Sequence, residues 1–362
     1  MGVPYFQVKD ILSDIKATVF SSQFALYRDF SRRVFALAQI ELGKIEQYSI
    51  DECFFTICGE AAVVEQKLFT LKRKLEQCTG IPVSIGVARS KTQAKYASIV
   101  AKKTNGVYVL SDSAWSEAVG ALGLGQIWGI GRAREMQFQS KGLRTVAELI
   151  ALSRAQVLAF FGFDGVRLWT ELNGEVALPV LCSAPAQKSY MSTGSFPKST
   201  SEKAVLIEAI QHHLQSVTRD LYQHAQRATR VRVLIYPSRH SDYAFQGASK
   251  EATLAIPTND LFKLQEIALT LFMECYKSGV PYKRAGVVVS ELVDFNHSTG
   301  SLFPESGRNQ AMSDMLFTLQ QRFGSTRITL GAVAHKSKHW RSQRDVQSPD
   351  YTTNWQSLKL VR

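Results

Sequence analysis

Two adjacent carboxylates, Asp51 and Glu52, interrupt an otherwise apolar run from Tyr48 to Ile57. The flanking residues are β-branched and aromatic, a composition typical of a buried strand. Burying two carboxylates is costly unless something positive neutralises them, and the run itself contains no Lys or Arg. Mg²⁺ prefers oxygen ligands and usually binds one or two carboxylates together with substrate phosphates. The pair therefore predicts a magnesium site for phosphoryl or nucleotidyl transfer, although an Asp-Glu pair is also common in a solvated turn, and neighbours on a strand point to opposite faces.

A second candidate site lies on a predicted helix at 91–103, which follows a predicted strand at 83–87. Lys is a mobile point charge that suits a triphosphate, and Lys95 and Lys102 on the polar side of this helix could face one. A solvated basic helix face would give the same pattern. The small residues expected to pack on the sheet are Ala94, Ala97 and Ala101.

Two further segments could bind a phosphate backbone. Gly129 and Gly131 precede Arg132 at the start of a predicted helix, where free backbone N–H groups can bind phosphate, although a lone Gly-x-Gly is often only a tight turn. Arg230 and Arg232 alternate with apolar residues. One face of that strand would pack while the other presents guanidinium groups, and edge protection against aggregation would give the same alternation.

The composition sets limits on the class of protein. The chain has 362 residues, with 43 Lys and Arg against 31 Asp and Glu, so its net charge is +12. This balance suits a polyanionic partner, either nucleic acid or an anionic membrane surface. No apolar run approaches the roughly 20 residues that cross a bilayer, and we expect no signal segment. Five scattered cysteines without Cys-x-x-Cys spacing indicate a reduced, cytoplasmic protein without structural zinc, and His212-His213 is expected to be an exposed helical pair.

The elements that must position these residues suggest a multidomain α+β fold. Strands and helices alternate in two separate stretches, each long enough for its own core. Helices are predicted over 24–42, 64–77, 91–103, 202–227, 260–276 and 310–322, and strands over 46–58, 83–87, 230–236, 253–256 and 285–292. The predicted divisions are a short N-terminal segment (1–20), an α/β domain (21–121), a helical subdomain (122–181), a linker (182–190), a second α/β domain (191–294) and an irregular C-terminal region (295–362).

The motifs resemble those of one enzyme family. Ser49-Ile50-Asp51-Glu52 is similar to the acidic motif of Y-family translesion DNA polymerases, and 48–54 most resembles the UmuC branch, the catalytic subunit of bacterial polymerase V. Ser84-Ile85-Gly86-Val87-Ala88 and the helix through Lys102 match the family at the same distance from the acidic pair. Residues 127–132 with 141–149 resemble its helix-hairpin-helix, and 340–355 resembles the C-terminal signature of the UmuC branch.

The resemblance implies a polymerase right hand, with a remnant of the fingers at 1–20, an α/β palm at 21–121, a helix-hairpin-helix thumb at 122–181 and a little finger at 191–294. It implies error-prone translesion synthesis in the SOS response, in which Asp51 and Glu52 hold catalytic Mg²⁺ and Lys102 contacts the phosphates of the incoming dNTP. The thumb and little finger would hold primer-template DNA, and the implied protein partners are a cleaved UmuD-like dimer and RecA. Ser301-Leu302-Phe303 resembles the sliding-clamp peptide, but Thr299 and Gly300 replace its usual Gln and first Leu.

The resemblance begins about fifty residues into a typical family member. The first metal-binding Asp, the gate that excludes ribonucleotides and further triphosphate contacts would precede Met1, and we expect residues 1–362 alone to show no measurable polymerase activity. The alternative is a shortened, non-catalytic paralogue that binds DNA. A cyclase palm would leave the thumb-like and little-finger-like segments without a role.

Overall fold

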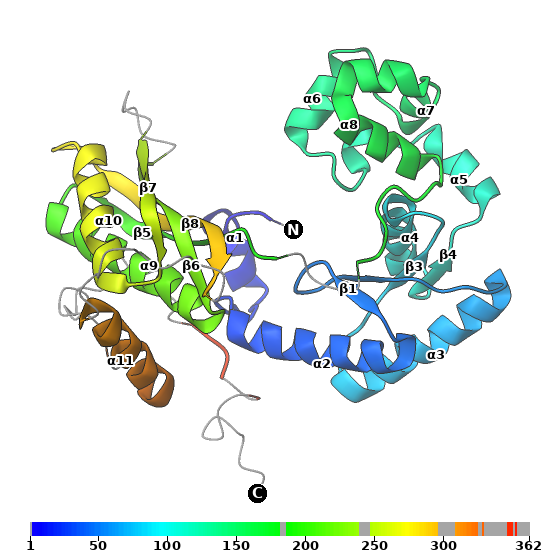
Figure 1. The fold of residues 1–362 in the computed structure, drawn as a ribbon. Helices are drawn as coiled ribbons and strands as arrows, with labels where there is room; N and C mark the ends of the chain where they lie inside the picture. The colour runs from blue at the N-terminus through cyan, green and yellow to red at the C-terminus, as the bar shows by residue number, and fades with distance from the viewer. Residues whose placement is uncertain are drawn as a thin grey trace, which may run out of the picture. The chain divides into compact units, whose positions relative to one another are not determined.

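The computed structural model describes residues 2–181, 186–238, 247–295, 308–324 and 328, together with 346–349 and 352. The chain forms two compact units (Figure 1), one made of Met1–Ala184 with Val346–Arg362 and the other of Pro185–Asp345. The predicted linker at 182–190 spans this boundary, but residues 182–185 lie outside the described part of the chain. None of the described helices is both long and apolar enough to cross a bilayer.

The first half of the first unit is an α/β layer. Two helices, α2 (Phe24–Leu42) and α3 (Ala61–Thr79), pack together, and α4 (Lys91–Lys103) packs on β3 (Ile85–Val87), which pairs in parallel with β4 (Val107–Val109). The predicted helices are confirmed here, whereas α1 (Tyr5–Asp14) and β4 were not predicted. The core of this layer consists of Ala38, Val64, Leu68, Leu71, Leu75, Ile85 and Val107.

The predicted strand at 46–58 is wrong in one important respect. It is a hairpin of two short antiparallel strands, β1 (Ile45–Gln47) and β2 (Cys53–Phe55), with Ile45 opposite Phe55 and Gln47 opposite Cys53. The acidic pair therefore lies in the turn between the strands and not inside a buried strand. The apolar residues on either side of the turn gave the whole segment strand-like composition.

The second half of the first unit is helical, as predicted. The helices are α5 (Asp112–Val119), α6 (Arg132–Gln139), α7 (Val146–Ile150) and α8 (Arg154–Leu172), with a short 3₁₀ turn, η1 (Leu124–Gln126). Thr145 caps α7 through a reciprocal capping box with Glu148. Helix α8 bends at Gly162, where φ is +66°. The core of this part includes Leu124, Phe138, Val146, Leu149, Val157 and Leu172.

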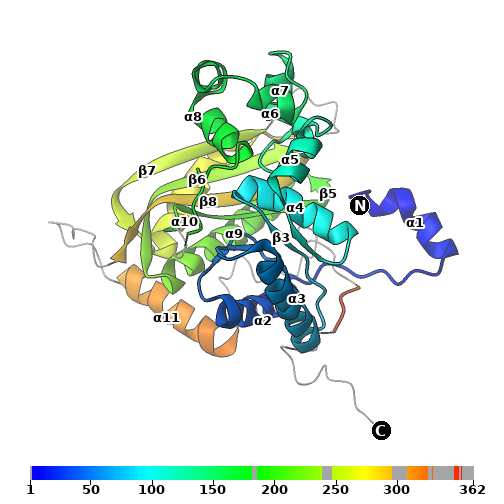
Figure 2. The same cartoon turned by 90° about the vertical axis from the view of Figure 1, so that its right-hand side faces the viewer.

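The second unit is one antiparallel sheet covered on one face by two helices (Figures 1 and 2). Its strands are β5 (Ser189–Thr200), β6 (Gln226–Pro237), β7 (Ala248–Thr258) and β8 (Tyr282–Asp294), in the order β5-β8-β6-β7. The covering helices are α9 (Lys203–Gln223) and α10 (Leu261–Cys275), and α11 (Arg308–Phe323) packs on α10. Strand β5 was missed because its small polar residues resemble a linker.

Part of the C-terminal region contacts the start of α2. Ser21 N–H donates to the carbonyl of Val346 at 2.7 Å, and Ser21 forms an isolated bridge with Gln347. Ser348 Oγ donates to Gln23 Oε1 at 2.6 Å. These residues therefore belong to the first unit, although they follow α11 of the second unit in sequence.

The expectation of an exposed His212-His213 pair is wrong for His213, which is 6% exposed on the sheet side of α9. Its Nδ1 lies 2.8 Å from Ser192 Oγ on β5. Burial and the neighbouring His212 lower the pKa of His213 to about 3. The ring is therefore neutral in the folded protein at neutral pH.

The second unit should lose stability as the pH falls from about 6.5 toward 3. The unfolded chain takes up a proton on His213 near pH 6.5, whereas the folded chain does so only near pH 3. The free energy of unfolding is therefore highest above about pH 6.5. It falls on the order of a few kcal/mol as the pH drops toward 3. Urea unfolding of the whole chain, followed by hydrogen exchange in β5 and α9, would measure this. His213→Asn should flatten the pH dependence of that exchange, and an equally steep profile in the variant would contradict it.

Candidate active site and nucleic-acid surfaces

The acidic turn is closed by its own backbone and side chains. The N–H groups of Tyr48 and Ser49 donate to the carbonyl of Glu52, at 3.0 and 3.1 Å. Ser49 Oγ donates to Asp51 Oδ1 at 2.5 Å and accepts from the Asp51 N–H at 3.3 Å. Asp51 is exposed and Glu52 is half-buried. Both carboxylates therefore lie where a ligand from solvent can reach them.

Helix α4 places a row of lysines beside the hairpin. Lys91 Nζ lies 2.6 Å from Glu46 Oε2, and Lys95 pairs with Glu52 Oε1. The positive charge that the sequence run lacked is thus supplied from another element. Residues 95 and 102 lie two helical turns apart, so Lys102 follows Lys95 on the same side about 10 Å along the axis.

Lys95 and Lys102 differ in what they can bind. Lys95, one of the two lysines that could face a phosphate, is engaged by Glu52. Lys102 is exposed and forms no ion pair with any residue that the structure describes. Burial of Ala97 and Ala101 agrees with the predicted packing of α4. Lys102 is therefore the lysine of this row that remains available to an anionic ligand.

Asp51 and Glu52 could hold a divalent cation, but the described residues offer few further ligands. Among them there is no group of three or more His, Cys, Asp or Glu side chains that could hold a metal ion. Two carboxylates fit Mg²⁺, which keeps several waters and shares its coordination with substrate phosphates. Burial raises the pKa of the adjacent Cys53 to about 11, so this thiol stays protonated and the turn offers oxygen ligands.

An aromatic cluster joins the acidic turn to the glycine loop, and the sequence alone gave no sign of it. The ring of Trp128 lies 5.3 Å from that of Tyr48 and 5.6 Å from that of Phe54, between centroids. Lys91 Nζ lies 5.0 Å from the Phe54 ring. Trp128 directly precedes Gly129, so the turn and the loop are neighbours in the first unit.

The glycine loop has the geometry expected for backbone contacts. Gly129 has φ of +84°, a conformation that favours glycine. Gly131 is the N-cap of α6 and Arg132 its first residue, and no side chain caps this helix end. Gly129, Gly131 and Arg132 are all exposed. Uncapped N–H groups of a first turn are suited to bind phosphate.

Arg230 and Arg232 lie on the face of the second unit's sheet that the helices leave open. Val231, which lies between the two arginines, and Val233, which follows Arg232, are fully buried. The alternation of basic and apolar residues predicted this burial. Strand β6 is central in the sheet, so edge protection does not explain these arginines. The guanidinium groups on this face are paired, because Glu251 pairs with both and Glu291 pairs with Arg230.

Three comparisons with known proteins bear on this arrangement. The model of the impB/mucB/samB family matches residues 1–99, and the model of that family's C-terminal domain matches 187–302. A domain of unknown function matches residues 313–361. Protein ImpB of Salmonella typhimurium is 26% identical over the whole of this chain and 88% of its own length, and protein UmuC of the same species gives the same figures.

A solved structure has the same fold. A Y-family DNA polymerase chimera matches with a TM-score of 0.65 at 18% identity, over 81% of this chain and 83% of its own. The predicted α+β, multidomain right-hand fold is confirmed by this likeness. The sequence family and the fold of the chain thus agree.

Proposed function

Because the chain belongs to the impB/mucB/samB family of Y-family DNA polymerases, we propose that it carries out template-directed nucleotidyl transfer on damaged DNA, as the polymerase V type of enzyme in the SOS response. The substrates would be primer-template DNA and dNTPs, and the cofactor Mg²⁺. Such an enzyme would act in the cytoplasm, where bacterial DNA lies.

Each part of the site has a role in this proposal. Asp51 and Glu52 would hold Mg²⁺, which when bound neutralises the charge that develops on the transferring phosphoryl group. Lys102 would bind and orient the triphosphate, since it is the exposed lysine of the α4 row. Gly129, Gly131 and Arg132 would hold the DNA backbone through N–H groups and charge, without reading its sequence. Catalysis would then consist mainly of positioning and charge neutralisation.

One observation carries the proposal: the acidic turn, the lysine row of α4 and the glycine loop lie together in one unit. The ion pair between Lys95 and Glu52 joins the first two, and the contact of Trp128 with Tyr48 joins the third. Carboxylates, a free lysine and uncapped N–H groups are the three kinds of group that metal, triphosphate and DNA backbone require.

A non-catalytic DNA-binding role is the second candidate, and two observations favour it. The described residues contain no three-carboxylate cluster, and one oxygen of Glu52 is already paired with Lys95. Primer extension separates the two candidates, because both require DNA binding and only one requires nucleotide addition. The expected protein partners, a cleaved UmuD-like dimer and RecA, remain proposals, and the clamp-like Ser301-Leu302-Phe303 lies outside the described residues.

Binding of primer-template DNA should weaken strongly with salt and depend little on sequence. With three to four phosphate contacts, affinity should fall roughly 40-fold to 150-fold between about 50 and 200 mM monovalent salt, since each contact releases counterions. Fluorescence anisotropy titrations with two unrelated primer-templates would measure both properties. An affinity that stays flat across this range would remove DNA binding from the proposal.

A further inference from the structure

The open sheet face of the second unit carries a network of two arginines and two glutamates. Glu251 on β7 lies directly opposite Arg232 on β6 in the strand register. Arg232 Nε donates to Glu251 Oε2 at 2.7 Å, and Arg230 Nη1 donates to the other oxygen, Oε1, at 3.3 Å. Arg230 Nη2 also lies 2.8 Å from Glu291 Oε1 on β8. Both carboxylate oxygens of Glu251 therefore serve the two arginines.

These carboxylates hold the positions that phosphate oxygens would take. Arginine binds carboxylate and phosphate with the same planar fork of donors. The four side chains are between one third and one half exposed, so the network is open to solvent and a polyanion could reach it. Ion pairs this exposed add little to stability, so folding alone gives no strong reason for them.

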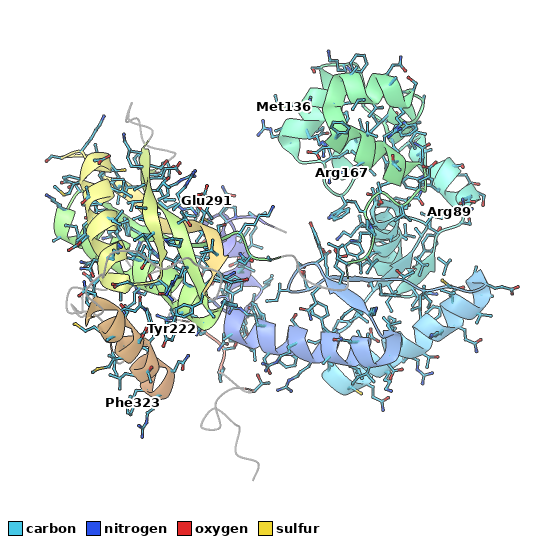
Figure 3. The ribbon with its side chains drawn as sticks, viewed as in Figure 1. Arg89, Met136, Arg167, Tyr222, Glu291 and Phe323 are labelled. Carbon is cyan, nitrogen blue, oxygen red and sulfur yellow. The ribbon has the colours of Figure 1, made fainter. Side chains whose placement is uncertain are left out.

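Glu291 supplies an independent observation. It has φ of +54°, a left-handed conformation that a residue other than glycine rarely adopts inside a strand. It lies between Ser290 and Leu292, which pair with Arg230 and Ala228 in an unshifted register of β8 with β6, at the point where the pairing of β6 with β7 shifts between Ala228 and Arg230. Figure 3 labels Glu291 on the second unit. Glu291 thus combines a strained backbone conformation with an ion pair to Arg230. Such an outlier calls for a functional reason.

We propose that Glu251 and Glu291 occupy Arg230 and Arg232 in the free protein and release them to DNA phosphates on binding, so that these two carboxylates limit the affinity of the sheet face for DNA. The inference rests on the proposed function, because it takes DNA as the ligand. Each DNA phosphate must displace a glutamate carboxylate, which reduces the net binding free energy gained from its contact with the arginine. The glutamates also keep the guanidinium groups oriented, so the arginines need little rearrangement when DNA arrives.

Glu251→Gln should bind primer-template DNA more tightly than the wild type. One additional effective phosphate contact predicts a gain of about 15-fold near 50 mM monovalent salt and about fourfold near 200 mM, with the slope of log K against log salt more negative by about 0.9. Glu266→Gln is the matched control, because it removes the same charge from an exposed position on α10, a helix of the opposite face. Its gain should be much smaller.

Two further variants make the test decisive. Glu291→Gly removes the second carboxylate and suits the positive φ, so it should fold at least as well as the wild type and also bind DNA more tightly. In an Arg230→Ala/Arg232→Ala background, Glu251→Gln should give no gain over the background. The inference is overturned if Glu251→Gln and Glu266→Gln bind alike, or if the gain persists without the arginines. Failure of the wild-type chain to bind DNA would instead refute the proposed function.

Discussion

Primer extension should fall at least about a thousandfold when Asp51 or Glu52 is replaced by alanine, because a bound metal contributes several kcal/mol and each 1.36 kcal/mol is tenfold in rate. Affinity for primer-template DNA should stay unchanged or rise slightly, since removing negative charge beside phosphates cannot weaken their binding. The two carboxylates are expected to act together, so the double variant should be little worse than either single one.

Because residues 1–362 alone are expected to be inactive, the measurement is single-nucleotide extension with Mg²⁺ by the chain carrying an added N-terminal strand with the first metal-binding Asp, in parallel with anisotropy titration of the same DNA. Glu117→Ala is the matched control, because Glu117 is an exposed carboxylate on α5 of the same unit, away from the acidic turn. It should extend primers at the wild-type rate. Extension by Asp51→Ala or Glu52→Ala near that rate would show that the metal assignment is wrong.

The sequence predicted the regular elements well where the pattern is local. Helices α2 and α4 repeat their apolar residues every three to four positions, and both lie where the periodicity indicated. The acidic hairpin was different. Strands of three residues pair across the turn from Tyr48 to Glu52, and a pairing of that kind depends on contacts between segments that local composition does not encode.

The partners of the charged residues could not be read from the sequence for the same reason. Lys95 and Glu52 are 43 positions apart, and Arg232 and Glu251 are 19 apart. The residue types alone indicated which charged side chains lie on exposed faces of helices and strands. Which charge neutralises which is decided by strand register and by the packing of α4 on β3. The contact of Trp128 with Tyr48 is also a product of tertiary packing.

Glu171, which lies in no recognisable motif, connects the lysine helix α4 to α8. Its side chain is fully buried near the end of α8. One carboxylate oxygen accepts the Thr92 N–H at the start of α4, at 3.0 Å, and the other accepts the N–H groups of Ala177 and Leu178, at 2.9 and 2.8 Å. A carboxylate at a helix N-terminus is also favoured by the helix dipole. Glu171 thus joins α8, α4 and the chain that follows α8.

Glu171→Ala should destabilise the first unit by about 3–5 kcal/mol, because one buried and two partly buried N–H groups would lose their acceptor and a cavity would remain. For a unit of this size that is a fall of roughly 10 °C in Tm. Glu171→Gln keeps one acceptor oxygen and should lose less. Glu175→Ala, an exposed glutamate four residues later, is the control and should melt like the wild type.

Thermal unfolding combined with hydrogen exchange would locate the effect. Exchange should accelerate in α4 and at the end of α8, while β6 and β8 of the second unit stay protected. Because Lys102 is carried by α4, the variant should also lose affinity for dNTP at temperatures where the rest of the chain remains folded. If Glu171→Ala and Glu175→Ala melt at the same temperature, water has replaced the carboxylate at these N–H groups, and the position of α4 depends instead on its apolar contacts with β3, through Ala97 and Ala101.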